Sequence, residues 1–136
     1  MKNRIPAVVV IILGLLAAIG PRTIFPVCPV GDMKMRCYST ASAELASGLI
    51  GAAVGIALLL TDRKKIRIIL SVFEFIIGLI IVLIPTVIVG VCGNAMMHCV
   101  SVTKPALIVT GIFDALVSLV LILLTLRDIS IEKKTR

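Results

Sequence analysis

The sequence predicts an all-α membrane protein, a bundle of four transmembrane helices built from two tandem helical hairpins. Of its 136 residues, 60% are apolar, and the mean hydropathy is +1.20. The apolar residues form long runs rather than short amphipathic stripes, which indicates that lipid surrounds them. The second half of the chain also repeats the first.

Four apolar segments have the length of a membrane span. A spanning helix needs about 20 mostly apolar residues to cross about 30 Å of hydrocarbon. The repeats are predicted at 1–65 and 66–136, with spans, outer loops and a tail as follows: spans 5–27, 43–60, 66–91 and 106–126; loops 28–42 and 92–105; cytoplasmic tail 127–136.

The positive charges are segregated along the chain. The net charge of +7 divides into ten Lys and Arg on one side of the predicted bundle and four on the other. Because cationic flanks stay in the cytoplasm during insertion, the termini and the 62–67 turn are predicted to be cytoplasmic and the two loops external. This pattern favours a multi-pass protein of the plasma (inner) membrane over a nucleic-acid-binding protein. The ten are Lys2, Arg4, Arg63, Lys64, Lys65, Arg67, Arg127, Lys133, Lys134 and Arg136; the four are Arg22, Lys34, Arg36 and Lys104.

An internal repeat supports the two-hairpin prediction. Residues 12–28 align with 76–92 at an offset of 64 without a gap. The likeness resumes at an offset of 62, where 35–39 faces 97–101. An even number of spans gives both units the same orientation, so the symmetry axis is predicted along the membrane normal. The identical pairs in the first match include a Gly, a Pro and a Cys, which apolar composition alone would not align: Ile12/Ile76, Gly14/Gly78, Leu15/Leu79, Pro21/Pro85, Ile24/Ile88, Val27/Val91 and Cys28/Cys92.

Two features of the spans concern helix shape and packing. Pro21 and Pro85 each remove a backbone donor and are predicted to kink or end their helices. Ser47, Gly51 and Gly55 recur every four residues, a spacing that lets helix backbones approach closely. Contact inside the bundle is the simpler interpretation, and a seam for a second protein is the alternative.

The four cysteines are predicted to lie on the outer face, where an oxidising compartment favours disulfides. We expect Cys28 to pair with Cys37 and Cys92 with Cys99, as staples over the bundle, although bridges between the halves stay open. The topology is similar to that of four-span membrane thiol–disulfide oxidoreductases. Eight and six residues separate the cysteines here, whereas a reactive pair is typically C-x-x-C.

A third interpretation of the loops is a soft-metal site. Thioether, thiolate and imidazole groups favour copper(I), and the loops carry Met33, Met35, Met97 and His98 besides the cysteines. Oxidised cysteines would be lost as ligands, and methionine is also an ordinary packing residue. The prediction is therefore no metal and no cofactor.

Two acids lie inside the predicted spans. Glu74 and Asp114 each follow the start of their helix by about 13 Å, from opposite sides of the bilayer. A charge at that depth costs at least about 2.5 kcal/mol on insertion scales, so we expect both to face the bundle as neutral acids. Expected partners are backbone carbonyls or the hydroxyls of Ser71, Thr110 and Ser118; a proton or cation path, or a contact to a partner's helix, is the alternative.

A third acid lies nearer the predicted outer surface. Glu44 is predicted at the interface between lipid and water, where it could complement Arg36 or Lys104.

The chain resembles a known family. Four spans, outer cysteines and the motif Met35-x-Cys37-x-x-Thr40 before the second helix resemble a small bacterial and archaeal membrane family labelled domain of unknown function 4418. The resemblance covers essentially the whole chain and implies a four-span fold but no activity. Its members are often encoded near ABC-type export permeases, which implies an accessory role.

No nucleophile–base pair, phosphate loop or closed metal motif occurs in the sequence. The prediction is a non-enzymatic accessory or interaction subunit of an envelope complex, with a lipid bilayer and a membrane protein or a second copy as partners. The alternatives are the membrane thiol–disulfide oxidoreductase and soft-metal (copper-type) binding or transport through the outer loops.

Overall fold

The computed structural model describes residues 4–24, 36–88 and 99–136. These residues form four long helices, α1 (Arg4–Thr23), α2 (Arg36–Leu60), α3 (Lys64–Leu83) and α4 (Lys104–Thr135). A π-helical turn, η1 (Ile84–Ile88), continues α3, and a second, η2 (Cys99–Thr103), leads into α4. Each of the four long helices is long and apolar enough to cross a membrane. The chain is therefore a multi-pass membrane protein by the length and composition of its helices.

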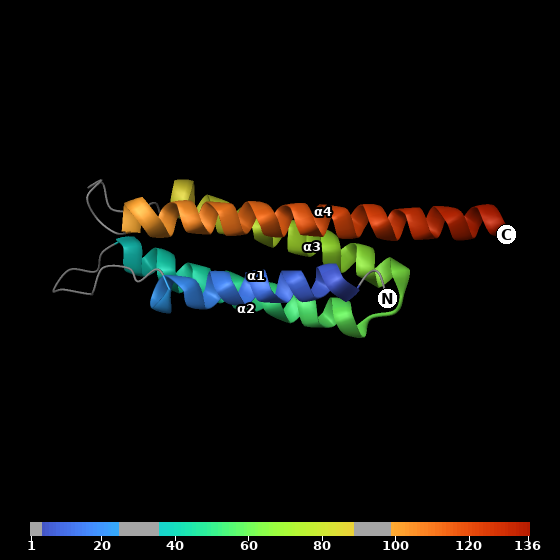
Figure 1. The fold of residues 1–136 in the computed structure, drawn as a ribbon, viewed down its shortest axis with the longest axis horizontal. Helices are drawn as coiled ribbons and strands as arrows, with labels where there is room; N and C mark the ends of the chain where they lie inside the picture. Colours follow the sequence, from blue (N-terminus) through green and yellow to red (C-terminus); the bar gives the residue numbers. More distant parts are fainter. Residues whose placement is uncertain (1–3, 25–35, 89–98) are drawn as a thin grey trace.

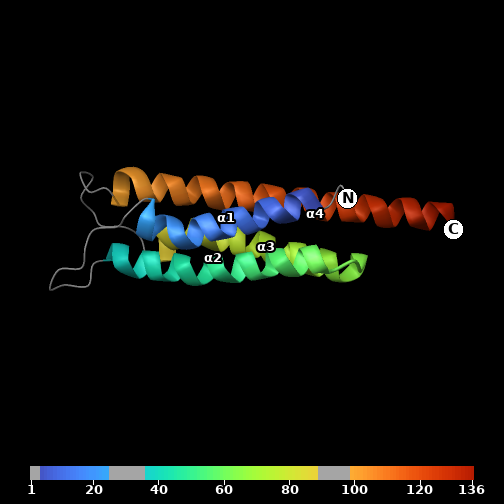
Figure 2. The same ribbon diagram turned by 60° about the horizontal axis from the view of Figure 1, so that its bottom comes forward.

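The helices lie side by side in an elongated bundle (Figures 1 and 2). α1 packs mainly against α2 and α3 mainly against α4, and the two hairpins meet along smaller α1–α4 and α2–α3 interfaces. Both termini and the connection between α2 and α3 lie at one end of the bundle, here called the terminal end (Figure 1). The predicted all-α bundle of hairpins is confirmed.

The connection between α2 and α3 is a tight turn. Arg63 adopts an extended conformation, with φ of −76° and ψ of 115°, directly before α3. The Arg67 guanidinium then donates a hydrogen bond of 2.9 Å to the Thr61 carbonyl, a group at the end of α2 that has no partner within the helix. The charged turn thus satisfies the backbone where the apolar run stops.

α2 and α4 extend beyond the spans that hydropathy predicted, whereas α1 ends at Thr23, before the predicted end of its span at residue 27. α2 begins at Arg36, inside the predicted outer loop, and η2 begins at Cys99, inside the other. α4 runs through the predicted tail to Thr135, and its 32 residues make about 48 Å of helix. Hydropathy detects only the lipid-length window, whereas backbone hydrogen bonds continue a helix into water. The end of α4 consequently projects past the other helices (Figure 2).

Pro21 and Pro85 lie in the corresponding region of the two hairpins, but the local helix structure around them differs. α1 passes through the buried Pro21 and ends two residues later, at Thr23, with one further backbone hydrogen bond from the Ile24 amide to the Gly20 carbonyl. Pro85 lies within η1, directly after α3. A π-turn is one way to accommodate a residue that lacks a backbone donor.

Glycines bring α1 and α2 into backbone contact. A Cβ added at Gly14 would lie 2.8 Å from the Ala52 nitrogen, and one added at Gly48 would lie 2.6 Å from the Ala18 nitrogen. Distances under 3.0 Å leave no room for a methyl group, so only glycine fits at these two positions without a shift of the backbone. Close approach of this kind replaces the hydrophobic drive that is absent between helices in lipid.

The same arrangement occurs between α3 and α4. A Cβ added at Gly78 would lie 2.9 Å from the Ala115 nitrogen, and one added at Gly111 would lie 2.9 Å from the Gly78 carbonyl oxygen. Each hairpin is thus closed by a pair of glycines facing each other across two helices.

Large apolar side chains cover the outside of the bundle. Leu60 is 78% exposed and Val87 is 76% exposed, which is the face that lipid solvates. Inside the bundle, Ala7, Val10, Leu58 and Leu121 form one buried cluster. Apolar side chains therefore lie both inside and outside the bundle, as expected where lipid is the solvent.

We predict that Gly48→Ala destabilises the protein by about 1–3 kcal/mol, the usual cost of overpacking. The effect opposes helix propensity, which alone would favour alanine by up to about 1 kcal/mol. Unfolding in mixed detergent micelles measures it. Ala53→Val, at an exposed position of the same helix, is the control and should change little. A Gly48→Ala variant as stable as the natural protein would contradict the close contact.

Candidate functional site

The candidate site is a pair of carboxyl groups in the interior of the bundle. Glu74 projects from α3 and Asp114 from α4, and the residues are 0% and 1% exposed. The two carboxyl groups lie close enough to influence each other electrostatically. They approach the same depth because α3 and α4 are antiparallel and each acid lies about 13 Å along its span.

Two glycines make room for the carboxyl groups. A Cβ added at Gly51 of α2 would lie 3.0 Å from Glu74 Oε1, and one added at Gly78 would lie 3.2 Å from Asp114 Oδ2. Glu74 therefore reaches across the interface between the two hairpins to α2. The pair joins three helices at one point.

The hydroxyl groups expected to bind these acids are directed elsewhere. Ser71 Oγ donates to the Arg67 carbonyl, Thr110 Oγ1 to the Ala106 carbonyl and Ser118 Oγ to the Asp114 carbonyl, each at 2.8 Å. The expectation of hydroxyl partners for the carboxyl groups is wrong, because a hydroxyl four residues past a carbonyl on the same helix already has an acceptor within reach.

The four carboxyl oxygens of the pair are buried and accept no hydrogen bond from any described group. A hydrogen bond between two carboxyl groups requires a proton on one of them, since carboxylates only accept. Two bare charges in an apolar interior would cost many kcal/mol. The arrangement is therefore chemically suited to holding a proton.

Glu44 is a separate buried acid. The expectation that it lies at the interface beside Arg36 or Lys104 is not met, since the residue is 0% exposed and both carboxyl oxygens lack a described hydrogen-bond partner. Its backbone carbonyl accepts a 3.2 Å hydrogen bond from Ser47 Oγ. The side chain is enclosed because α2 begins earlier than predicted, which places Glu44 two turns inside the helix.

The predicted packing stripe divides between two neighbours. Gly51 faces Glu74 of α3, whereas a Cβ added at Gly55 would lie 2.6 Å from the Ile11 side chain of α1. Ser47 is half-buried and bonded to its own helix. Sequence reasoning missed Gly48, whose spacing of four from Ala52 and match to the Gly14–Ala18 spacing in the first span were the available signal.

The predicted redox and metal residues fall largely outside the described part of the chain. Cys37 lies in the first turn of α2 and Cys99 at the start of η2, but their side chains are outside the described residues. The pairings Cys28–Cys37 and Cys92–Cys99 stay predictions. The remaining members of these sets lie outside the described ranges: Cys28, Cys92, Met33, Met35, Met97 and His98.

Within residues 4–24, 36–88 and 99–136, no group of three or more His, Cys, Asp or Glu side chains could hold a metal ion. The acid pair is the only cluster of two interacting titratable groups that we identify inside the membrane spans of this described part.

We predict that Glu44→Met raises the free energy of unfolding by about 1–3 kcal/mol, because methionine removes a buried polar group without a partner. Unfolding in mixed micelles measures the change. Glu132→Met is the matched control at an exposed site and should change stability by less than about 1 kcal/mol, the usual worth of its surface ion pair with Lys64. Destabilisation by Glu44→Met would mean that the carboxyl group has a partner.

Comparison with known proteins gives one match. No curated protein matches the chain, and no solved structure matches it. The model of one protein family, Domain of unknown function (DUF4418), matches residues 10–124, a range that contains both acids and all four cysteines. The chain is a membrane protein that belongs to the family Domain of unknown function (DUF4418).

Proposed function

We propose that this protein is a non-enzymatic accessory subunit that docks on a transmembrane helix of a larger envelope protein, with a permease of the ABC-type export class as the partner. The observation that carries the proposal is an apolar groove between α1 and α4 of about 460 Å³. The implied neighbourhood of export permeases supports the choice of partner.

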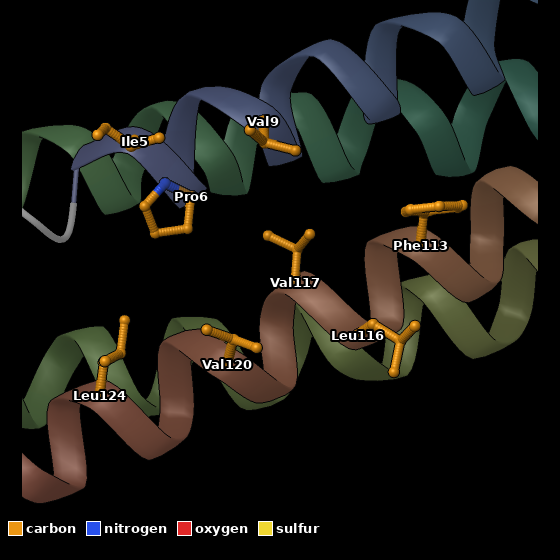
Figure 3. Close-up of a pocket in the computed structure, with 8 residues that line it drawn as sticks. All are labelled: Ile5, Pro6, Val9, Phe113, Leu116, Val117, Val120 and Leu124. Carbon is orange, nitrogen blue, oxygen red and sulfur yellow. The ribbon is translucent and has the colours of Figure 1, made fainter.

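The groove follows the interface where the two hairpins diverge (Figure 3). Pro6 and Val9 of α1 face Val117 and Val120 of α4 across the gap. Its large side chains are open to the outside, Ile5 at 70% and others near half. Since partner helices in lipid associate by shape rather than by hydrophobic drive, a long concave apolar track is a fitting surface. The lining residues are Ile5, Pro6, Val9, Phe113, Leu116, Val117, Val120 and Leu124.

The projecting end of α4 supports the same proposal. Its final turns are exposed and charged and project beyond the other helices. An ion pair between Lys64 Nζ and Glu132 Oε2, at 2.5 Å, ties this segment to the start of α3. This segment offers a partner a second contact outside the bilayer. It directly follows the part of α4 that lines the groove, which ends at Leu124.

The two hairpins are proposed to be tandem repeats. The Gly14–Ala52 contact of the first hairpin has its counterpart in Gly78–Ala115, at offsets of 64 in the first helix and 63 in the second. Burial recurs at the same offsets, for example at Leu58 and Leu121, both 1% exposed.

One residue inserted in the second repeat accounts for the change of offset from 62 to 63 at the start of its second helix. The match of Ser39 to Ser101 has an offset of 62, while that of Thr40 to Thr103 has an offset of 63. The π-turn η2 spans the point of change, and a π-turn accommodates one extra residue within a helix.

The terminal end of the bundle is proposed to face the cytoplasm, and the ends that carry the cysteines are proposed to face outward, as disulfide-bonded staples. The clustering of Arg4, Arg63, Lys64, Lys65 and Arg127 toward the terminal end supports this orientation through the positive-inside rule.

We predict that a photocrosslinking amino acid at Val120, in native membranes, captures a different integral membrane protein, identified by mass spectrometry as a permease. The same probe at Leu119 is the control. Val120 and Leu119 are similarly exposed, at 49% and 42%, but Leu119 does not line the groove, so it should capture lipid. Recovery of only the monomer or a self-dimer from Val120 would contradict the docking proposal.

We predict that a membrane-impermeant maleimide added to intact cells labels the cysteines only after mild reduction, because they are external and paired. The chain has four cysteines, so peptide mapping locates each adduct. Labelling without reduction would rule out the disulfides. Labelling only after permeabilisation would place these cysteines inside the cell and invert the orientation.

A further inference from the structure

We propose that Glu74 and Asp114 form a proton-binding site in the middle of the bilayer, whose occupancy controls how tightly the two hairpins pack. The proposal stands on the arrangement of the two side chains and of the helices around them, and is independent of the docking proposal.

The acid pair must hold a proton when the bundle is closed. All four carboxyl oxygens are buried, and no described group donates a hydrogen bond to them. One proton shared between the groups creates a donor and leaves a single negative charge, and a second proton leaves none. Both states cost far less than two charges in contact within an apolar interior.

Among the residues that the structure describes, no basic side chain lies near the pair to compensate for a lost proton. On α1, no titratable residue lies between Arg4 and Arg22. On α2 the nearest is another acid, Glu44, seven residues before Gly51 and thus about 10 Å along the helix.

On the helices that carry the acids, the nearest basic groups are also distant. Arg67 of α3 donates to the Thr61 carbonyl in the turn. Lys104 stands at the start of α4, ten residues and about 15 Å before Asp114. Release of the proton therefore exposes a charge that only water can solvate.

The packing of the helices limits the route by which water could reach Glu74 and Asp114. Backbone contacts at Gly78 and Gly111 close α3 against α4, and those at Gly14 and Gly48 close α1 against α2. The interface between hairpins is smaller, and Glu74 Oε1 lies in it, against Gly51. Water that reaches the deprotonated pair must enter between the hairpins, so proton release loosens that interface.

The first hairpin packs in the same way as the second without acids at the positions that correspond to Glu74 and Asp114. At the offsets given above, Glu74 corresponds to Val10 and Asp114 to Gly51. Val10 is 0% exposed, as is Glu74, and the glycine contacts of the two hairpins are alike. A valine and a glycine thus serve the same packing positions without the cost of buried carboxyl groups, which favours a role in binding over one in packing.

Infrared difference spectroscopy on the full chain in phosphatidylcholine bilayers tests the proton site, because a protonated carboxyl group has its own carbonyl band. The natural protein should lose this band reversibly as the pH rises over about pH 5 to 10. The double variant Glu74→Gln/Asp114→Asn should lack most of the change, whereas Glu44→Gln, which alters another buried acid, should keep it. A band in the natural protein that does not titrate in this range, or one unaffected by the double variant, would overturn the proposal.

Unfolding in mixed micelles as a function of pH tests the link to hairpin packing. Because the folded bundle keeps its proton to a higher pH than the unfolded chain does, the unfolding midpoint of the natural protein should fall as the pH rises. The double variant, which carries neutral amides, should show a flatter profile. Equal pH dependence in the two proteins would overturn the coupling. If the double variant fails to fold, the Glu44→Gln spectrum decides the proton site, because a titrating band that disappears in Glu44→Gln would belong to Glu44 and would overturn the proposal.

Discussion

Close contact between helix backbones at paired glycines is the interaction on which this structure depends. In lipid, apolar side chains gain nothing by leaving one helix surface for another, so association requires an exact steric fit and satisfied polar groups. Gly48 against Ala18 and Gly78 against Ala115 provide that fit in the two hairpins. Once each hairpin is closed in this way, the remaining features of the protein concern how the two hairpins meet.

The interface between the hairpins is the smaller one, and both proposals concern it. It has an open apolar groove on the α1–α4 side and the contact of Glu74 with Gly51 on the α2–α3 side. A tight interface would exclude a partner and would trap a proton permanently. A less tightly packed interface allows the two hairpins to shift relative to each other. Such shifts convert small changes at a site into larger movements.

Buried carboxyl groups without donors are costly, and this chain has three within its described residues, Glu44, Glu74 and Asp114. Their cost is lower when they are neutral than when they are charged. Glu74 and Asp114 differ from Glu44 because they lie beside each other, and this pairing is the basis of the proposed proton site.

The sequence by itself determined that lipid surrounds the helices, how many spans there are and that they form hairpins. Hydropathy is averaged over about 20 residues, so a few atypical residues do not change this prediction. It also located Glu74 and Asp114 inside the spans. Only the tertiary structure decided that these acids meet, that Ser71, Thr110 and Ser118 bond to their own helices, and that Glu44 is enclosed. It likewise decided that Gly48 faces α1 while Gly51 faces α3. The physical reason is that such contacts depend on the rotation of each helix about its axis, and in nearly uniform apolar segments rotation is set by the fit of neighbouring helices rather than by an amphipathic pattern.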